Sequence, residues 1–137
     1  MDYLLDTNAC IALNKGDPAP VRVRFDKAIH AGARVWVSTV VLYELWYGVA
    51  KSARPTENTE DLATFLAGPV SVLDFGEEDA KEAGSVRASL ERVGKPIGAY
   101  DMLIAGQALS RKLTLVTANA REFGRIKGLV WEDWAKG

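Results

Sequence analysis

Hydrophobic positions follow two different periods along this chain of 137 residues. Short runs of β-branched and apolar residues, such as 34–38 and 113–117, are typical of buried strands. Longer stretches in which apolar residues recur every three or four positions, such as 77–93, are typical of helices packed on one face. Because strands and helices alternate, the pattern predicts an α/β fold with a central, mostly parallel sheet and helices on both faces.

The predicted strands cover 3–5, 34–38, 70–73, 113–117 and 129–131, and the predicted helices cover 8–14, 18–32, 39–51, 56–66, 77–93 and 99–109. Glycine and proline mark many of these boundaries, among them Gly16, Pro55 and Gly94. Residues 118–123 continue from the fourth strand, and no separate element is predicted for them. No repeat or linker divides the sequence, so we expect a single domain that spans residues 1–137.

The composition is that of an ordinary globular protein, with 48% hydrophobic and 26% charged residues. The 17 basic and 18 acidic residues nearly cancel, so overall basicity cannot hold a nucleic acid and any such partner needs local contacts. Cys10 is the one cysteine, which excludes an intramolecular disulfide and a cysteine-based zinc cage. We expect Cys10 to pack as a small apolar residue.

The sequence also indicates where in the cell the protein is expected. Its start lacks the basic segment and long apolar run of a secretory signal. No apolar run approaches the roughly 18 residues that a membrane span requires. We therefore expect a cytoplasmic protein without a membrane partner.

An acidic residue stands at the end of the first predicted strand. Asp6 follows the apolar run 3–5 and precedes the first predicted helix. In parallel α/β sheets, ligands bind in the crevice beyond the carboxyl ends of the strands, so Asp6 is a candidate site residue. The alternative is that Asp6 only caps the helix that follows.

Two further acids lie in predicted helices beside apolar positions. Glu44 shares one side of its helix with Val41 and Leu45, where an uncompensated carboxylate is unfavourable unless it extends to water. Asp101 lies in the first turn of the apolar helix 99–109, where a capping role at the helix N-terminus is the alternative to a site role.

Right-handed crossovers can bring Asp6, Glu44 and Asp101 into one crevice. Adjacent carboxylates repel each other strongly, and a divalent cation relieves that repulsion. All-oxygen ligands favour Mg²⁺ or Mn²⁺ over zinc, and such a site is suited to phosphodiester hydrolysis. His30, the one histidine, lies far from these acids in sequence, and we interpret it as structural or solvated.

Four segments in this order resemble the PIN-domain ribonucleases, in particular the VapC toxins of bacterial toxin-antitoxin pairs. The similarity covers essentially the whole chain. Each motif is weakly specific by itself, whereas the four together are specific. The segments are Leu4-Leu5-Asp6-Thr7-Asn8, Glu44-Leu45-Trp46-Tyr47-Gly48, Tyr100-Asp101-Met102-Leu103-Ile104-Ala105 and Thr114-Leu115-Val116-Thr117-Ala118-Asn119-Ala120-Arg121-Glu122-Phe123.

The resemblance implies that Asp6, Glu44 and Asp101 bind the metal and act in catalysis, with Asn119 as the fourth member of the site. Family members carry Asp or Asn at that position, and an Asn adds no charge. The alternative for Asn119 is an asparagine tolerated in a turn. Thr7 and Thr117 fall where the family often places hydroxyls near the site.

The resemblance further implies an RNA substrate, a VapB-type antitoxin partner and a homodimer. The chain resembles in particular VapC toxins that cut transfer RNA, including initiator tRNA. Trp46, Tyr47 and Trp131 are candidates for partner contacts, although core packing is the commoner fate of an aromatic residue.

Two other classes compete with a nuclease. One is a catalytically weak or inactive PIN-like module that binds RNA or protein through the same groove, with Asn119 marking lost chemistry. The other is a phosphatase or phosphoacceptor domain, but phosphatases of the haloacid-dehalogenase type have a second acid where this chain has Asn8. A dinucleotide-binding domain is disfavoured because no glycine follows Asp6 in the first turn.

Overall fold

The structure is a computed structural model that describes residues 1–136. The strands are β1 (Tyr3–Leu5), β2 (Val35–Ser38), β3 (Ser71–Leu73), β4 (Thr114–Val116) and β5 (Trp131–Glu132). The helices are α1 (Thr7–Lys15), α2 (Ala19–His30), α3 (Thr39–Ala50), α4 (Pro55–Leu66), α5 (Glu77–Arg92), α6 (Ala99–Arg111), α7 (Ala120–Phe123) and the 3₁₀ helix η1 (Trp134–Lys136).

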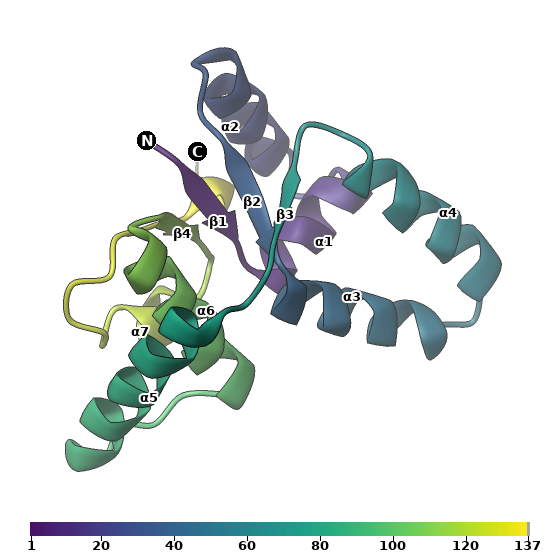
Figure 1. The fold of residues 1–137 in the computed structure, drawn as a ribbon. Helices are drawn as coiled ribbons and strands as arrows, with labels where there is room; N and C mark the ends of the chain where they lie inside the picture. The colour runs from purple at the N-terminus through teal and green to yellow at the C-terminus, as the bar shows by residue number, and fades with distance from the viewer. Residues whose placement is uncertain (137) are drawn as a thin grey trace.

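The strands form one parallel sheet in the order β3-β2-β1-β4-β5. In β1, Leu4 and Leu5 are both fully buried although successive side chains point to opposite faces. Both faces of the sheet are therefore covered, and in Figure 1 α1, α3 and α4 gather on one side of it while α5 and α6 lie on the other. The predicted fold class is confirmed.

The strand order creates a switch point beside β1. The chain continues from β1 to β2 on one side and returns later as β4 on the other. Leu5 pairs with Val37 of β2 and with Val116 of β4, so these strands end at the same level. The crevice beyond the carboxyl ends at such a point is the usual ligand site of an open α/β sheet.

Most predicted elements lie within a few residues of the observed ones, and two predictions near the C-terminus were wrong. Residues 118–123 do not simply continue from the fourth strand, because α7 forms over Ala120–Phe123. The last strand covers Trp131–Glu132 and not 129–131, because Leu115 and Val116 of β4 pair with these two residues.

A close crossing of two helices fixes the position of α6. A Cβ atom added to Gly106 of α6 would lie 2.5 Å from the backbone N and Cα atoms of Ala83 in α5. The same pair is tied by Asp79, a buried acid in the first turn of α5 whose carboxylate accepts hydrogen bonds from Arg111 and Ser110. These contacts hold α6, and with it Asp101, against α5.

One smaller expectation is met. Cys10 is fully buried in the core, as predicted for a small apolar residue. None of the helices within residues 1–136 combines the length and the apolar character that a membrane span requires.

Candidate active site

Asp6 occupies the position that the sequence predicted, directly after β1. Its backbone N–H donates to the Val116 carbonyl oxygen at 3.1 Å, which places it beside the end of β4. Its Oδ1 accepts a 2.8 Å hydrogen bond from the Ala9 backbone N–H, so Asp6 does cap α1. It is only 6% exposed, and burial followed by the nearby charges of Glu44 and Asp133 raises its pKa. The capping role therefore coexists with a charge environment unusual for a helix cap.

Thr117 links Asp6 to Asn119 at the end of β4. The buried Thr117 hydroxyl hydrogen-bonds the Asp6 carboxylate, which partly offsets the rise in pKa. The same hydroxyl accepts a 3.0 Å hydrogen bond from the Asn119 backbone N–H. Asn119 is the N-cap residue of α7, and its side chain makes no capping bond there. Asn119 is thus a half-buried residue directly beyond the end of β4.

Glu44 is held toward the strand ends. Ser38 caps α3 with its side chain, accepting from the Val40 backbone N–H at 3.1 Å, and Glu44 lies one and a half turns into this helix. Its Oε1 accepts a 2.8 Å hydrogen bond from the Thr7 hydroxyl. The half-buried carboxylate is therefore tethered to the start of α1 and does not extend freely into water.

Among the carboxyl groups of the site, that of Asp101 has the largest shift in pKa. It is half-buried in the first turn of α6, and burial is the largest cause that raises its pKa to about 6. A hydrogen bond with the Glu122 side chain and the negative charges of Glu122, Asp6 and Glu44 raise it further. The three predicted acids thus lie in one electrostatic neighbourhood, although they are far apart in sequence.

Glu122 is a site residue that the sequence reasoning missed. It lies on α7, half-buried, with its carboxyl group in contact with that of Asp101. Its spacing from Asn119 could have indicated a place in the site. Residues three positions apart share one face of a helix, but that spacing is informative only if a helix is recognised over 120–123. His30, in contrast, is exposed and its Nδ1 lies 2.7 Å from the Asp26 carbonyl oxygen, as expected for a solvated residue.

The donor set fits an oxygen-preferring divalent cation in its chemistry. Buried and half-buried carboxylates with raised pKa values carry repulsion that a cation would relieve. Within residues 1–136, however, no three acidic, histidine or cysteine side chains are grouped as a ready metal cluster. The carboxylates are instead bonded to their own neighbours, Asp6 to Ala9 and Thr117, and Glu44 to Thr7.

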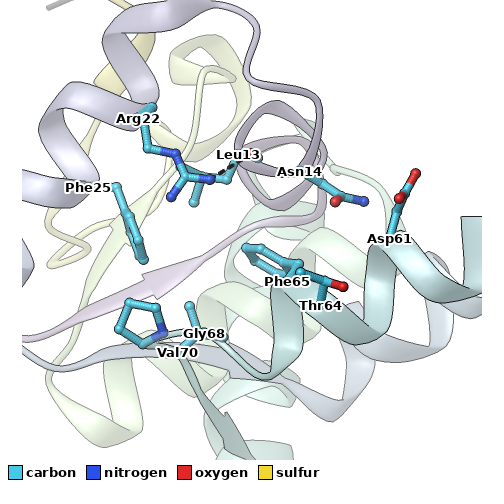
Figure 2. Close-up of a pocket in the computed structure, with 10 residues that line it drawn as sticks. Leu13, Asn14, Arg22, Phe25, Asp61, Thr64, Phe65, Gly68 and Val70 are labelled. Atoms are coloured by element: carbon cyan, nitrogen blue, oxygen red, sulfur yellow. Dashed lines mark hydrogen bonds between the residues drawn. The ribbon is translucent and has the colours of Figure 1, made fainter.

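A separate pocket of about 350 Å³ lies between α1, α2 and α4. Figure 2 shows the side chains of Arg22, Phe25 and Phe65 around it, with the Arg22 guanidinium donating to the Leu13 carbonyl oxygen at 3.0 Å. None of the predicted site acids lines this pocket. Leu13 is seven residues beyond Asp6 along α1, about 10 Å of helix rise, so the pocket is distinct from the acidic crevice.

Comparison with known proteins identifies the family. The PIN domain family matches residues 3–129. The tRNA(fMet)-specific endonuclease VapC of Shigella flexneri is 43% identical, over 98% of this chain and 99% of that protein. Ribonuclease VapC2 of Rickettsia felis is 37% identical, over 99% of this chain and 100% of that protein.

The fold agrees with these sequence matches. The crystal structure of VapBC2 from Rickettsia felis bound to a DNA fragment from their promoter contains a chain that superposes with a TM-score of 0.91 at 35% identity, covering 98% of this chain and 99% of that one. Similarity in sequence and in structure thus extends over nearly the full length of both proteins. The chain belongs to the PIN-domain family and, within it, to the VapC ribonuclease toxins.

Proposed function

We propose that this ribonuclease hydrolyses RNA phosphodiester bonds as a Mg²⁺- or Mn²⁺-dependent endonuclease in the crevice beyond β1 and β4. The observation that carries the proposal is the half-buried Asp101, whose pKa is raised to about 6 among Glu122, Asp6 and Glu44. Asp6, Glu44 and Asp101 would hold the cation. When bound, it supplies positive charge against the phosphate and lowers the pKa of water to a range useful near neutrality.

The protein's own residues orient these acids. The Thr7 hydroxyl fixes one oxygen of Glu44, and the Thr117 hydroxyl with the Ala9 N–H fixes Asp6. Glu122 contacts Asp101 from α7. We assign Asn119, whose amide adds no charge, the role of orienting substrate or water at the edge of the crevice.

We infer that the substrate is a transfer RNA, with initiator tRNA as the first candidate. The support is the full-length similarity to the Shigella flexneri protein, which is named as specific for tRNA(fMet). The reaction is placed in the cytoplasm, where mature tRNA is found.

We further propose that a VapB-type antitoxin inhibits the enzyme and that the toxin forms a homodimer. The similarity to a VapBC complex supports the antitoxin. The pocket between α1, α2 and α4 offers the partner a concave surface of mixed polarity, whose lining includes Arg22, Asp61 and Phe65. Replacing Asp61, an exposed residue that lines the pocket, with Arg should weaken binding of the cognate antitoxin, measured by calorimetry, while leaving RNA cleavage by the free toxin intact.

The decisive experiment incubates antitoxin-free protein, refolded from denaturant, with total cellular RNA and sequences the ends produced. We expect 5′-phosphate and 3′-hydroxyl ends in Mg²⁺ or Mn²⁺ and no cleavage in a chelator. Asp6→Ala, Glu44→Ala and Asp101→Ala should each abolish cleavage in protein that keeps its circular dichroism spectrum. Full activity of Asp101→Ala would overturn the proposal, and RNA binding without turnover by the wild type would favour the inactive PIN-like module.

A further inference from the structure

Two exposed tyrosines meet beside the acidic crevice. Tyr43 of α3 is 57% exposed and Tyr100 of α6 is 42% exposed. Their ring centroids are 5.6 Å apart with a tilt of 54°, and the Tyr100 hydroxyl donates to the Tyr43 hydroxyl across 3.4 Å. Each tyrosine directly precedes a site acid, Glu44 or Asp101. The pair therefore belongs to the rim of the crevice.

The pair is not part of the hydrophobic core. Neither ring is buried, whereas Leu45 and Met102, which follow the two acids in sequence, are buried core residues. The Tyr100 hydroxyl lies close enough to the site that the charge of Glu44 acts on it. Two large aromatic surfaces are thus presented to solvent next to the proposed reaction centre.

The charge of the molecule indicates what such a surface would bind. The crevice is acidic and the whole chain carries a net charge of −1, so general electrostatic attraction for a polyanion is weak. Aromatic side chains bind unpaired nucleobases by stacking, which does not require positive charge on the protein. RNA loops, in which bases are unstacked, offer such bases to a protein.

We propose that Tyr43 and Tyr100 form a stacking platform that positions an unpaired nucleobase of single-stranded RNA next to the scissile phosphate. This inference rests on the proposed function and assigns both tyrosines as positioning residues for its substrate. The two rings lie side by side and supply the binding surface, so the platform does not depend on their hydroxyl groups. A single-stranded loop is thereby selected over a continuous duplex, whose bases are stacked on one another.

The test compares Tyr43→Ala/Tyr100→Ala with Tyr43→Phe/Tyr100→Phe, which keeps both rings. Val23→Ala is the control for loss of an exposed apolar side chain, because Val23 lies in α2 and is 63% exposed. Binding of a fluorescent single-stranded RNA is measured in the Asp101→Asn background, and KM and kcat are measured without that change. We expect the double alanine variant to raise Kd and KM by about tenfold. The phenylalanine variant and the control should stay near the parent values.

A second substrate separates stacking from a structural effect. RNA with abasic positions flanking the cleavage site should bind the parent and the double alanine variant equally, because the stacked base is absent. A double alanine variant that binds intact RNA like the Val23→Ala control would overturn the inference. So would a changed molar mass in light scattering, which would assign the pair to contact between copies of the chain. Absence of cleavage by the wild type would instead refute the proposed function.

Discussion

The Thr7 hydroxyl donates a 2.8 Å hydrogen bond to Oε1 of Glu44, a residue 37 positions further along the chain. The bond joins the first residue of α1, beyond the end of β1, to the middle of α3, the helix that follows β2. β1 and β2 are paired neighbours in the sheet, so the residues that follow the two strands lie close together. The hydrogen bond from Thr7 then holds the Glu44 carboxylate in a fixed position. Thr7 thus acts on the site through Glu44.

Replacing Thr7 with Val should remove this orientation with little change in volume. We expect Mn²⁺ affinity or RNA cleavage to fall by about 10- to 100-fold, the usual effect of losing a partner that orients a metal ligand. Calorimetry with Mn²⁺ and initial cleavage rates provide the measurements. Thr7→Ser keeps the hydroxyl and should retain most activity. Equal values for the Val and Ser variants would show that the bond to Glu44 has no role.

The two residues of the α7 region should differ in importance. Glu122 contacts the Asp101 carboxyl group, whereas the hydrogen bond that Asn119 makes to Thr117 uses its backbone N–H. We therefore expect Glu122→Gln to reduce cleavage by about 100-fold or more, similar to the loss when one preorganised polar group is removed from a reaction centre. Asn119→Ala should reduce cleavage by about tenfold or less. Single-turnover rates at saturating protein provide the comparison. A larger loss of cleavage for Asn119→Ala than for Glu122→Gln would show that Asn119 is the more important of the two residues.

The placement of Asp6 could be predicted because it depends on local sequence and on topology. An apolar run followed by Asp-Thr-Asn marks the end of a strand and the start of a helix, and the parallel order places that point in a crevice. Asp101 could be placed in the same way, from an apolar helix with an acid in its first turn.

The contacts of Glu44 and Glu122 could not be predicted in this way. The bond from Thr7 to Glu44 depends on the rotamers of two residues on different helices, which periodicity does not specify. The helix α7 covers only Ala120–Phe123, about one turn, so it has no repeat of apolar positions to reveal it. Without that helix, nothing in the sequence indicated that Glu122 would face Asp101.

The metal-free protein should be destabilised by the ionisation of Asp101. Its pKa is about 6 in the folded state against an ordinary 3.8, so the folded state binds the proton more tightly than the unfolded state does. The stability gained from that proton is complete below about pH 4 and is lost as the pH rises through about 6. Ionised Asp101 therefore lowers the free energy of unfolding near neutral pH.

Thermal unfolding of Asp101→Asn in chelator tests this. At about pH 8 the variant should have a Tm higher than the wild type by about 2–5 °C, after allowance for partial exposure of the group. The difference should shrink as the pH falls toward about 4, where Asp101 is protonated. Excess Mn²⁺ should raise the Tm of the wild type more than that of the variant, since binding stabilises the folded state. A variant less stable than the wild type at both pH values would contradict the assignment.

The crossing of α5 and α6 offers a matched pair of glycines for a packing test. Gly106 lies within α6 against the Ala83 backbone, whereas a Cβ at Gly84 of α5 would meet no atom within 4 Å. Alanine in an open helical position stabilises by up to about 1 kcal/mol, so Gly84→Ala should raise the free energy of unfolding. Gly106→Ala should lower it by about 1–3 kcal/mol, because its Cβ can fit only if the helices separate.

Urea denaturation of both variants in chelator gives the comparison, and the cleavage rate connects it to the site. If separation of the helices displaces α6, Gly106→Ala should lose activity even where the protein remains folded, because Asp101 moves with the helix. Gly84→Ala leaves the crossing unchanged and should keep the wild-type rate. Should Gly106→Ala instead prove as stable and as active as Gly84→Ala, the close crossing would not be what positions the Asp101 carboxylate against Glu122.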